Sequence, residues 1–159
     1  MSMSKCLFIC LYFTNIAFAT TWPGDDDGKA NFNNIQAAVI AASDGDEIIV
    51  MPGIYTADTT ISFGEIDTSV SVVDTLGKAI WIRSESGPYV TFIDGEEEHH
   101  GIICKSGETS STVIEGFTVQ NCSAPWYDWN GNGQTDYWEY FGGGMWNRNG
   151  SSPTVLGCH

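Results

Sequence analysis

The stretch FNNIQAAVIAASDGDEIIVMPGIY, residues 32–55, decides the fold. In its first half, apolar side chains recur at the helical spacings of three and four: Phe32, Ile35, Val39 and Ala42. We therefore predict a helix over about residues 32–43, with Asn31 or Asn33 as its N-cap and the sequence SDGD at its end. A short strand follows at residues 47–50 and is closed by a Pro-Gly pair. The single apolar stripe indicates that the helix covers a surface of the protein and is not surrounded by it.

Downstream of this stretch the chain contains only short segments that are rich in β-branched residues and separated by Gly, Asp, Ser and Asn. The predicted strands are residues 69–73, 79–83, 90–93, 101–104, 112–114 and 117–120. No Asn-Gly or Asp-Gly pair joins two of them as a tight hairpin, apart from the ambiguous Asp94-Gly95, which the charged segment EEEHH follows. Strands of this length and spacing permit a sandwich, a barrel or a solenoid.

Two observations favour the solenoid. Residues 112–122 and 152–158 are both apolar segments that end in a cysteine, and Cys122 and Cys158 lie 36 positions apart. Subtracting an insertion of 12 residues leaves 24, a plausible length for one coil, so we predict that these cysteines stack, unbridged, inside successive coils. A helix before the first strand also suits a solenoid, because the first coil has an exposed edge to cover.

Residues 32–55 also resemble the start of a known family, the pectate-lyase-like right-handed parallel β-helix proteins. The matching positions are Phe32, Ile35, Gln36, Ala37, Ala38, Ala41, Ala42, Gly45, Asp46, Ile48, Val50, Pro52, Gly53 and Tyr55. The similarity continues through residues 77–84, 90–95 and 114–118, and residues 142–146 and 152–154 resemble repeats of secreted bacterial β-helix proteins and polymorphic outer-membrane proteins.

The resemblance implies an all-β fold over residues 31–159, a right-handed parallel β-helix (a solenoid) with an N-terminal capping α-helix. The chain ends within a coil at Cys158-His159, so we expect it to be C-terminally incomplete. The family contains polysaccharide lyases, glycoside hydrolases, adhesins and binding modules, and the fold alone does not choose among them.

Residues 1–19 have the features of a secretory signal peptide: a basic Lys5, an apolar run at 6–13 and the small-x-small exit Ala-Phe-Ala. We therefore predict a secreted, extracellular or cell-surface protein that begins at Thr20, with a turn-rich lead-in at 20–30. The apolar run of this segment is too short to cross a membrane, and no other run in the sequence approaches the roughly 18 apolar residues that a span needs.

The chain is strongly acidic, with a formal net charge of −14. Such a chain repels phosphate backbones, which disfavours nucleic-acid binding. Removing the signal peptide leaves three cysteines, an odd number, so we expect at least one to stay free or to pair outside this chain. Three cysteines do not make a disulfide-dense scaffold.

Residues 128–139, DWNGNGQTDYWE, match the pattern of the twelve-residue calcium loop, D-x-[DN]-x-[DN]-G-x5-E. By resemblance, the predicted ligands are Asp128, Asn130, Asn132, Gln134, Asp136 and Glu139. No helix precedes the loop, so we predict a weak calcium site in a loop inserted between coils, and not an EF-hand domain. The alternative is a surface loop that matches by chance.

An aromatic group surrounds this loop and also includes Trp146. Its candidates for stacking on sugar rings are Trp126, Trp129, Trp138 and Tyr140. The alternative is that these side chains pack the insertion onto the flank of the solenoid. His99 and His100 follow three glutamates and are expected in a solvated, charged turn, the alternative being a metal site with a carboxylate.

Catalytic patterns are not visible in this chain. Its few basic residues do not neighbour an Asp pair at same-face spacing, and Asn-Thr-Asp and Gly-His-Gly signatures are absent. We therefore expect a non-catalytic secreted module that binds polysaccharide or a cell-surface glycan, with calcium ordering one loop. The alternative is the N-terminal part of a polysaccharide lyase or glycoside hydrolase whose catalytic coils lie downstream.

Overall fold

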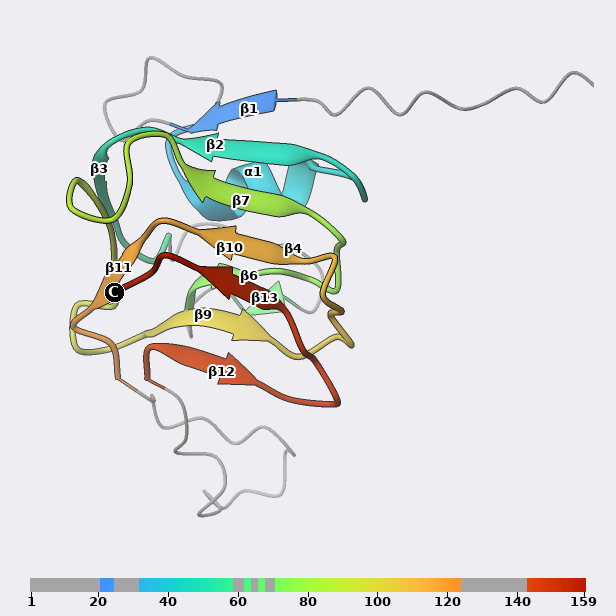
Figure 1. The fold of residues 1–159 in the computed structure, drawn as a ribbon. Helices are drawn as coiled ribbons and strands as arrows, with labels where there is room; N and C mark the ends of the chain where they lie inside the picture. Colours follow the sequence, from blue (N-terminus) through green and yellow to red (C-terminus); the bar gives the residue numbers. More distant parts are fainter. Residues whose placement is uncertain (1–20, 25–31, 59–61, 64–65, 68–70, 124–142) are drawn as a thin grey trace, which may run out of the picture.

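The computed structural model describes residues 21–24, 32–58, 62–63, 66–67, 71–123 and 143–159. Most strands in these residues are parallel and form three parallel sheets, with one short α-helix, an arrangement consistent with an all-β parallel solenoid (Figure 1). Sheet 1 contains β1 (Thr21–Gly24), β2 (Glu47–Val50), β7 (Trp81–Ser84), β10 (Val113–Glu115) and β13 (Thr154–Leu156) in that spatial order.

The other two parallel sheets have three strands each. Sheet 2 contains β3 (Gly53–Tyr55), β8 (Thr91–Asp94) and β11 (Thr118–Gln120). Sheet 3 contains β6 (Ser71–Asp74), β9 (His100–Cys104) and β12 (Met145–Asn147). An antiparallel pair, β4 (Ser62–Phe63) and β5 (Ile66–Asp67), lies in sequence between β3 and β6.

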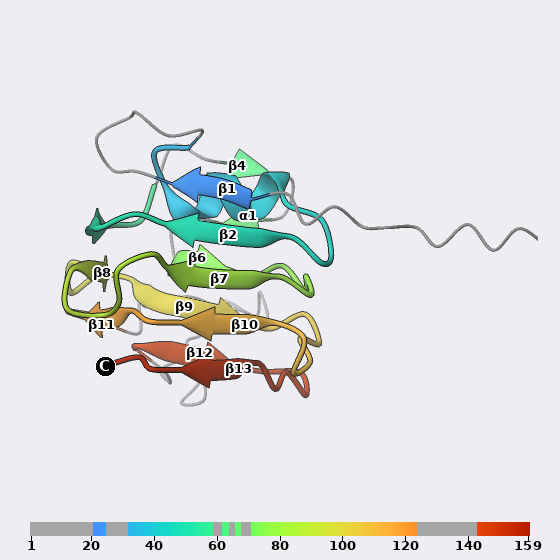
Figure 2. The same ribbon diagram turned by 45° about the horizontal axis from the view of Figure 1, so that its top comes forward.

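The chain visits the three sheets in a fixed order, and we call each passage through sheets 1, 2 and 3 a coil. The first coil contains β2, β3 and β6, the second β7, β8 and β9, and the third β10, β11 and β12, after which β13 returns to sheet 1. Figure 2 shows the resulting stack, with β1 at one end and β12 and β13 at the other.

One ladder of apolar side chains per sheet fills the interior. Pairing residues across the coils gives the ladders Ile48–Ile82–Ile114, Tyr55–Ile93–Val119 and Val73–Ile102–Met145. Successive rungs of a parallel sheet lie about 4.8 Å apart, so each ladder is a continuous apolar column. Along β2, β7 and β8, buried positions alternate with less buried ones, so one side of each of these strands faces the core.

The structure corrects the predicted coil length of 24 residues. From Ile48 to Ile82 a coil spans 34 residues, from Ile82 to Ile114 it spans 32, and from Ile114 to Val155 it spans 41. Each coil visits three sheets and also accommodates long corners, which the spacing between two cysteine-ending segments did not reveal.

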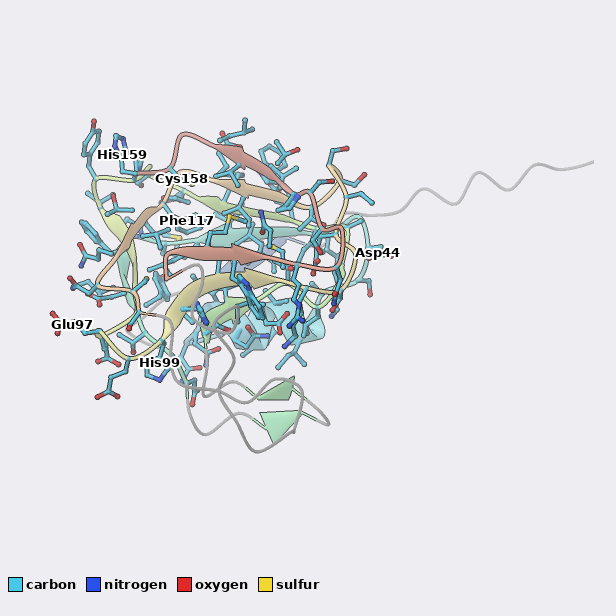
Figure 3. The ribbon with its side chains drawn as sticks, turned by 90° about the horizontal axis from the view of Figure 1, so that it is seen from below. Asp44, Glu97, His99, Phe117, Cys158 and His159 are labelled. Atoms are coloured by element: carbon cyan, nitrogen blue, oxygen red, sulfur yellow. The ribbon has the colours of Figure 1, made fainter. Side chains whose placement is uncertain are left out.

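The two cysteines behind that estimate are not equivalent. Cys122 follows β11 of sheet 2, whereas Cys158 follows β13 of sheet 1 and lies beside Phe117 (Figure 3). The similarity of the two segments therefore reflects a shared strand pattern and not a shared position in the coil. The prediction that Cys122 and Cys158 stack in successive coils is therefore wrong; Cys104, Cys122 and Cys158 are all free.

The helix α1 (Ile35–Ala41) is shorter than the predicted helix at residues 32–43, and its N-cap is Asn34. The Asn34 side chain, and not that of Asn31 or Asn33, accepts a hydrogen bond from the Ala37 N–H at 2.6 Å. At the other end, Lys78 Nζ donates to the carbonyls of Val39, Ile40 and Ala42 at 2.6–2.8 Å. A positive charge at these carbonyls stabilises the C-terminal end of the helix.

Gln36, on the same helix, occupies the open edge of sheet 3. Its side-chain amide donates to the Asp74 carbonyl at 3.2 Å and accepts from the Asp74 N–H at 2.7 Å. These are the bonds that a neighbouring strand would make to β6, so Gln36 satisfies an edge that would otherwise be open. Residues 21–24, expected within the turn-rich lead-in, instead form β1 and pair with β2 in sheet 1.

Candidate functional site

The predicted calcium ligands, within residues 128–139, and the four aromatic candidates for sugar contact, within 126–140, lie outside the described residues. Of that aromatic group, the structure describes Trp146, which is only 7% exposed. Its ring stacks on His100 with a centroid distance of 5.6 Å, and the Arg148 guanidinium lies 5.6 Å from its centroid. Trp146 therefore packs against the solenoid and is not a free stacking surface.

The sequence predicted a solvated turn for the two adjacent histidines, and this prediction is wrong. Both are buried, and His100 begins β9. His99 Nδ1 lies 3.2 Å from the Gly95 carbonyl oxygen, whereas His100 stacks on Trp146. The two rings have different neighbours, so this part of the structure does not bring them together around one ion.

The glutamates before them do form an exposed corner. Glu96, Glu97 and Glu98 are exposed, and Figure 3 labels Glu97 at the rim of the molecule. Asp94 joins this corner to the next coil, because its carboxylate accepts from the Gln120 and Asn121 side-chain amides at 2.8 and 3.0 Å. Burial raises the pKa of Asp94, but these hydrogen bonds and that from the Glu96 N–H outweigh it, and the pKa is lowered. Among the residues that the structure describes, no group of three or more His, Cys, Asp or Glu side chains is arranged to hold a metal ion.

Glu108 is a fully buried carboxylate at the corner that follows sheet 3. It accepts from Thr75 Oγ1 at 2.7 Å and the Gly77 N–H at 2.8 Å in the first coil, and from the Ser106 N–H at 2.9 Å in the second. Ser151 Oγ, after β12, donates to it at 2.6 Å. One side chain therefore joins the corners of three successive coils.

The electrostatics of this corner indicate a structural role. Burial raises the pKa of Glu108, but the hydrogen bonds from Ser151, Thr75, its own N–H and the Gly77 N–H outweigh it and lower the pKa, so the group stays ionised. The neighbouring Cys104 thiol lies 3.4 Å from Thr75 Oγ1, and burial raises its pKa to about 12. A thiol with that pKa is not a nucleophile near neutral pH.

A hollow of about 320 Å³ lies beside the start of α1, lined by residues that include Asn34, Tyr55 and Asp58. Asn34 caps the helix and donates from its side-chain amide to Asp58 at 2.9 Å. These polar groups hold the helix against the segment after β3. We therefore interpret the residues around the hollow as structural and not as a binding site.

The outer face of sheet 1 carries a different set of side chains. On β7, Ile82 and Ser84 are buried, whereas Trp81 and Arg83 face outward, with Trp81 41% exposed. The register places Glu47 beside Trp81 on β2 and Glu115 beside Arg83 on β10. We call Glu47, Trp81, Arg83 and Glu115 the Trp81 cluster.

Diagonal contacts across adjacent strands hold the Trp81 cluster together. Trp81 Nε1 donates to Glu115 at 3.0 Å, and Arg83 Nε donates to Glu47. The guanidinium of Arg83 also lies 5.5 Å from the centroid of the Trp81 ring, a cation–π arrangement. The aromatic side chain is thus held on the outer face of sheet 1 with carboxylates on both sides.

None of the four residues of the Trp81 cluster was predicted as a site residue from the sequence. The signal that would have found it is the alternation in AIWIRS, residues 79–84, where Trp81 and Arg83 occupy the face opposite Ile80 and Ile82.

Comparisons of the chain with protein-family models, with curated proteins and with solved structures found no match. The resemblance to pectate-lyase-like proteins therefore stays a prediction. Within the described residues, no helix is long and apolar enough to cross a membrane.

Proposed function

We propose that this protein is a secreted right-handed β-helix module that binds polysaccharide or a cell-surface glycan, with calcium ordering the loop at 128–139. The three parallel sheets and their fixed order of visits support the β-helix. The signal-peptide features of residues 1–19 support secretion, and the twelve-residue pattern supports a weak calcium site.

The observation that carries the binding function is the exposed indole of Trp81 on the outer face of sheet 1. Aromatic rings offer a rigid apolar surface to the C–H face of a sugar, while neighbouring polar groups bond its hydroxyls. Glu47, Arg83 and Glu115 supply such groups beside the ring.

The contacts of two other charged groups, Glu108 and Lys78, also fit a binding module better than an enzyme. Glu108 is buried and accepts from four donors, and Lys78 donates to three helix carbonyls. Both side chains are committed to holding coils together, which leaves them unsuited to proton transfer with a substrate.

Affinity electrophoresis of the secreted protein tests this function. Gels that contain xylan, glucomannan, β-glucan or polygalacturonate should retard the protein in at least one case, and a gel that contains no polysaccharide is the control. Unchanged mobility in every gel would contradict glycan binding. N-terminal sequencing of the same material should read from Thr20, and material that begins at Met1 would contradict secretion by this signal.

The calcium site is tested separately, by titrating wild type and Glu139→Ala while following tryptophan fluorescence. We expect wild type to respond with a dissociation constant of about 10⁻⁴–10⁻³ M, because Asn130 and Asn132 are neutral ligands and extracellular modules bind in this range. Identical responses of the two proteins up to several millimolar calcium would show that the loop binds no ion.

A further inference from the structure

The charges around Trp81 favour one class of glycan. Two carboxylates, Glu47 and Glu115, flank one guanidinium, Arg83, so the Trp81 cluster carries one net negative charge. Arg83 is already paired with Glu47 and lies over the indole ring, so its positive charge is largely neutralised within the cluster. The whole chain adds to this, because its net charge is −14.

We infer that the outer face of sheet 1 binds an uncharged glycan, with a pyranose ring stacked on the face of Trp81 that lies away from the Arg83 guanidinium. Its hydroxyls donate to Glu115 Oε1 and Glu47 Oε2, because the bonds to Trp81 and Arg83 use the other carboxylate oxygens. This inference rests on the proposed function and adds its site and ligand class. Sugar hydroxyls donate readily to carboxylates, and a bond to an ionised acceptor is stronger than one between neutral groups. Hydroxyl-rich, uncharged sugars therefore complement this face.

A polyuronate is the poorer ligand for the same reason. Each uronate carries a negative charge, and it would approach two carboxylates whose only cationic neighbour in the cluster is already paired. At physiological salt, charges within about 8 Å of each other are incompletely screened, so the repulsion acts on a bound chain.

The contacts of the cluster also reduce the entropy cost of binding. The Trp81 ring is held by its N–H bond to Glu115 and by the Arg83 guanidinium over its face. A side chain that is fixed before the ligand arrives loses little rotamer freedom on binding. The face is therefore preorganised, because the parallel register of β2, β7 and β10 sets the positions of its side chains.

Isothermal titration with defined oligosaccharides tests this inference. The uncharged probes are cellohexaose, xylohexaose, mannohexaose and laminarihexaose, and the anionic probe is hexagalacturonate. We expect at least one uncharged probe to bind and Trp81→Ala to weaken it by about tenfold or more, as removal of a central aromatic contact does. Trp81→Phe keeps a stacking ring and should retain most of the affinity, and it stays informative if Trp81→Ala does not fold.

Tyr89→Ala is the matched control. Tyr89 is 80% exposed and lies at the corner before β8, outside the Trp81 cluster, so its removal should change affinity by less than about twofold. The charge argument is tested by Glu47→Gln/Glu115→Gln, which converts the cluster from one net negative to one net positive charge. Affinity for hexagalacturonate should then rise by about tenfold at low salt.

The outcomes separate the inference from the function on which it rests. Binding of an uncharged probe that is equal in wild type, Trp81→Ala and Trp81→Phe would overturn this site and leave glycan binding standing. If wild type binds hexagalacturonate more tightly than every uncharged probe, the inferred ligand class, an uncharged glycan, is wrong. If no probe and no polysaccharide binds, both the inference and the proposed function are wrong.

Discussion

Sheets 1 and 3 are built from strands of similar length in the same coils, yet their outer faces differ. In sheet 1, β7 alternates between exposed or partly exposed side chains and buried ones, and Trp81 remains 41% exposed. In sheet 3, β6 and β9 are buried at every position, and Trp146 of β12 is only 7% exposed. Two tryptophans on equivalent kinds of strand thus meet different surroundings.

The difference distinguishes an aromatic side chain that packs in the fold from one that the proposed function places at a ligand. Trp146 stacks on a buried histidine, so its apolar area already contributes to folding. Trp81 contacts the half-buried side chains of Arg83 and Glu115 on the outer face of sheet 1, and it remains 41% exposed. Substitutions on the two faces should therefore separate stability from binding.

The largest loss of stability is expected for Trp146→Ala. Removing a buried aromatic side chain and leaving a cavity costs roughly 3–5 kcal/mol of unfolding free energy. Urea denaturation followed by circular dichroism measures this cost. A loss below about 1 kcal/mol would show that the outer face of sheet 3 is not packed as described.

Glu108→Gln, at the corner that follows sheet 3, should come next. The glutamine keeps one acceptor oxygen but turns its NH₂ group towards two donors, either those of Thr75 and Gly77 or those of Ser106 and Ser151. Leaving buried polar groups unsatisfied should cost roughly 1–3 kcal/mol at pH 7. Asp94→Asn, at the more exposed corner, is the matched control and should cost less.

The cost of Glu108→Gln should also depend on pH. The folded protein holds the pKa of Glu108 below its ordinary value of 4.5, so ionisation adds stability above pH 4.5. That contribution disappears as the pH falls through the lowered pKa, because the folded and unfolded states then both bind the proton. The stability difference between wild type and Glu108→Gln should therefore shrink below pH 4.5, and a difference that grows there would contradict this account.

The smallest loss of stability is expected for Trp81→Ala. Its ring is partly exposed and its partners are at the surface, so the cost should stay within about 1 kcal/mol. Urea denaturation beside Trp146→Ala makes the comparison direct. Equal losses for the two tryptophans would remove the distinction between the two outer faces.

Much of the fold was predictable from local patterns. The strand at residues 47–50 is confirmed as β2, and the other predicted strands overlap β6 to β11 within two residues. The register was not predictable, because long corners separate the strands and every coil repeats similar short apolar segments. Gln36 illustrates the limit: its position on the helix was visible, but its two bonds to Asp74 depend on a partner 38 residues away.

The candidate site was harder to predict than the fold for a physical reason. The Trp81 cluster comes from three strands, and Glu47 and Glu115 approach Trp81 only through the register of successive coils. The predicted site residues instead lie within residues 126–140, because acidic, amide and aromatic side chains are adjacent in the chain there. Trp146, at the edge of that group, is a packing residue, and its burial was not visible in the sequence.

The central claim is that glycan binds on the outer face of sheet 1, and nuclear magnetic resonance of the indole N–H groups tests it most directly. The Trp81 N–H donates to Glu115 beside the proposed ligand, whereas Trp146 is buried against His100. Titration with an uncharged oligosaccharide that binds should shift the Trp81 indole resonance, assigned through Trp81→Phe, and leave that of Trp146 unchanged. An unchanged Trp81 resonance at saturating oligosaccharide would contradict the claim.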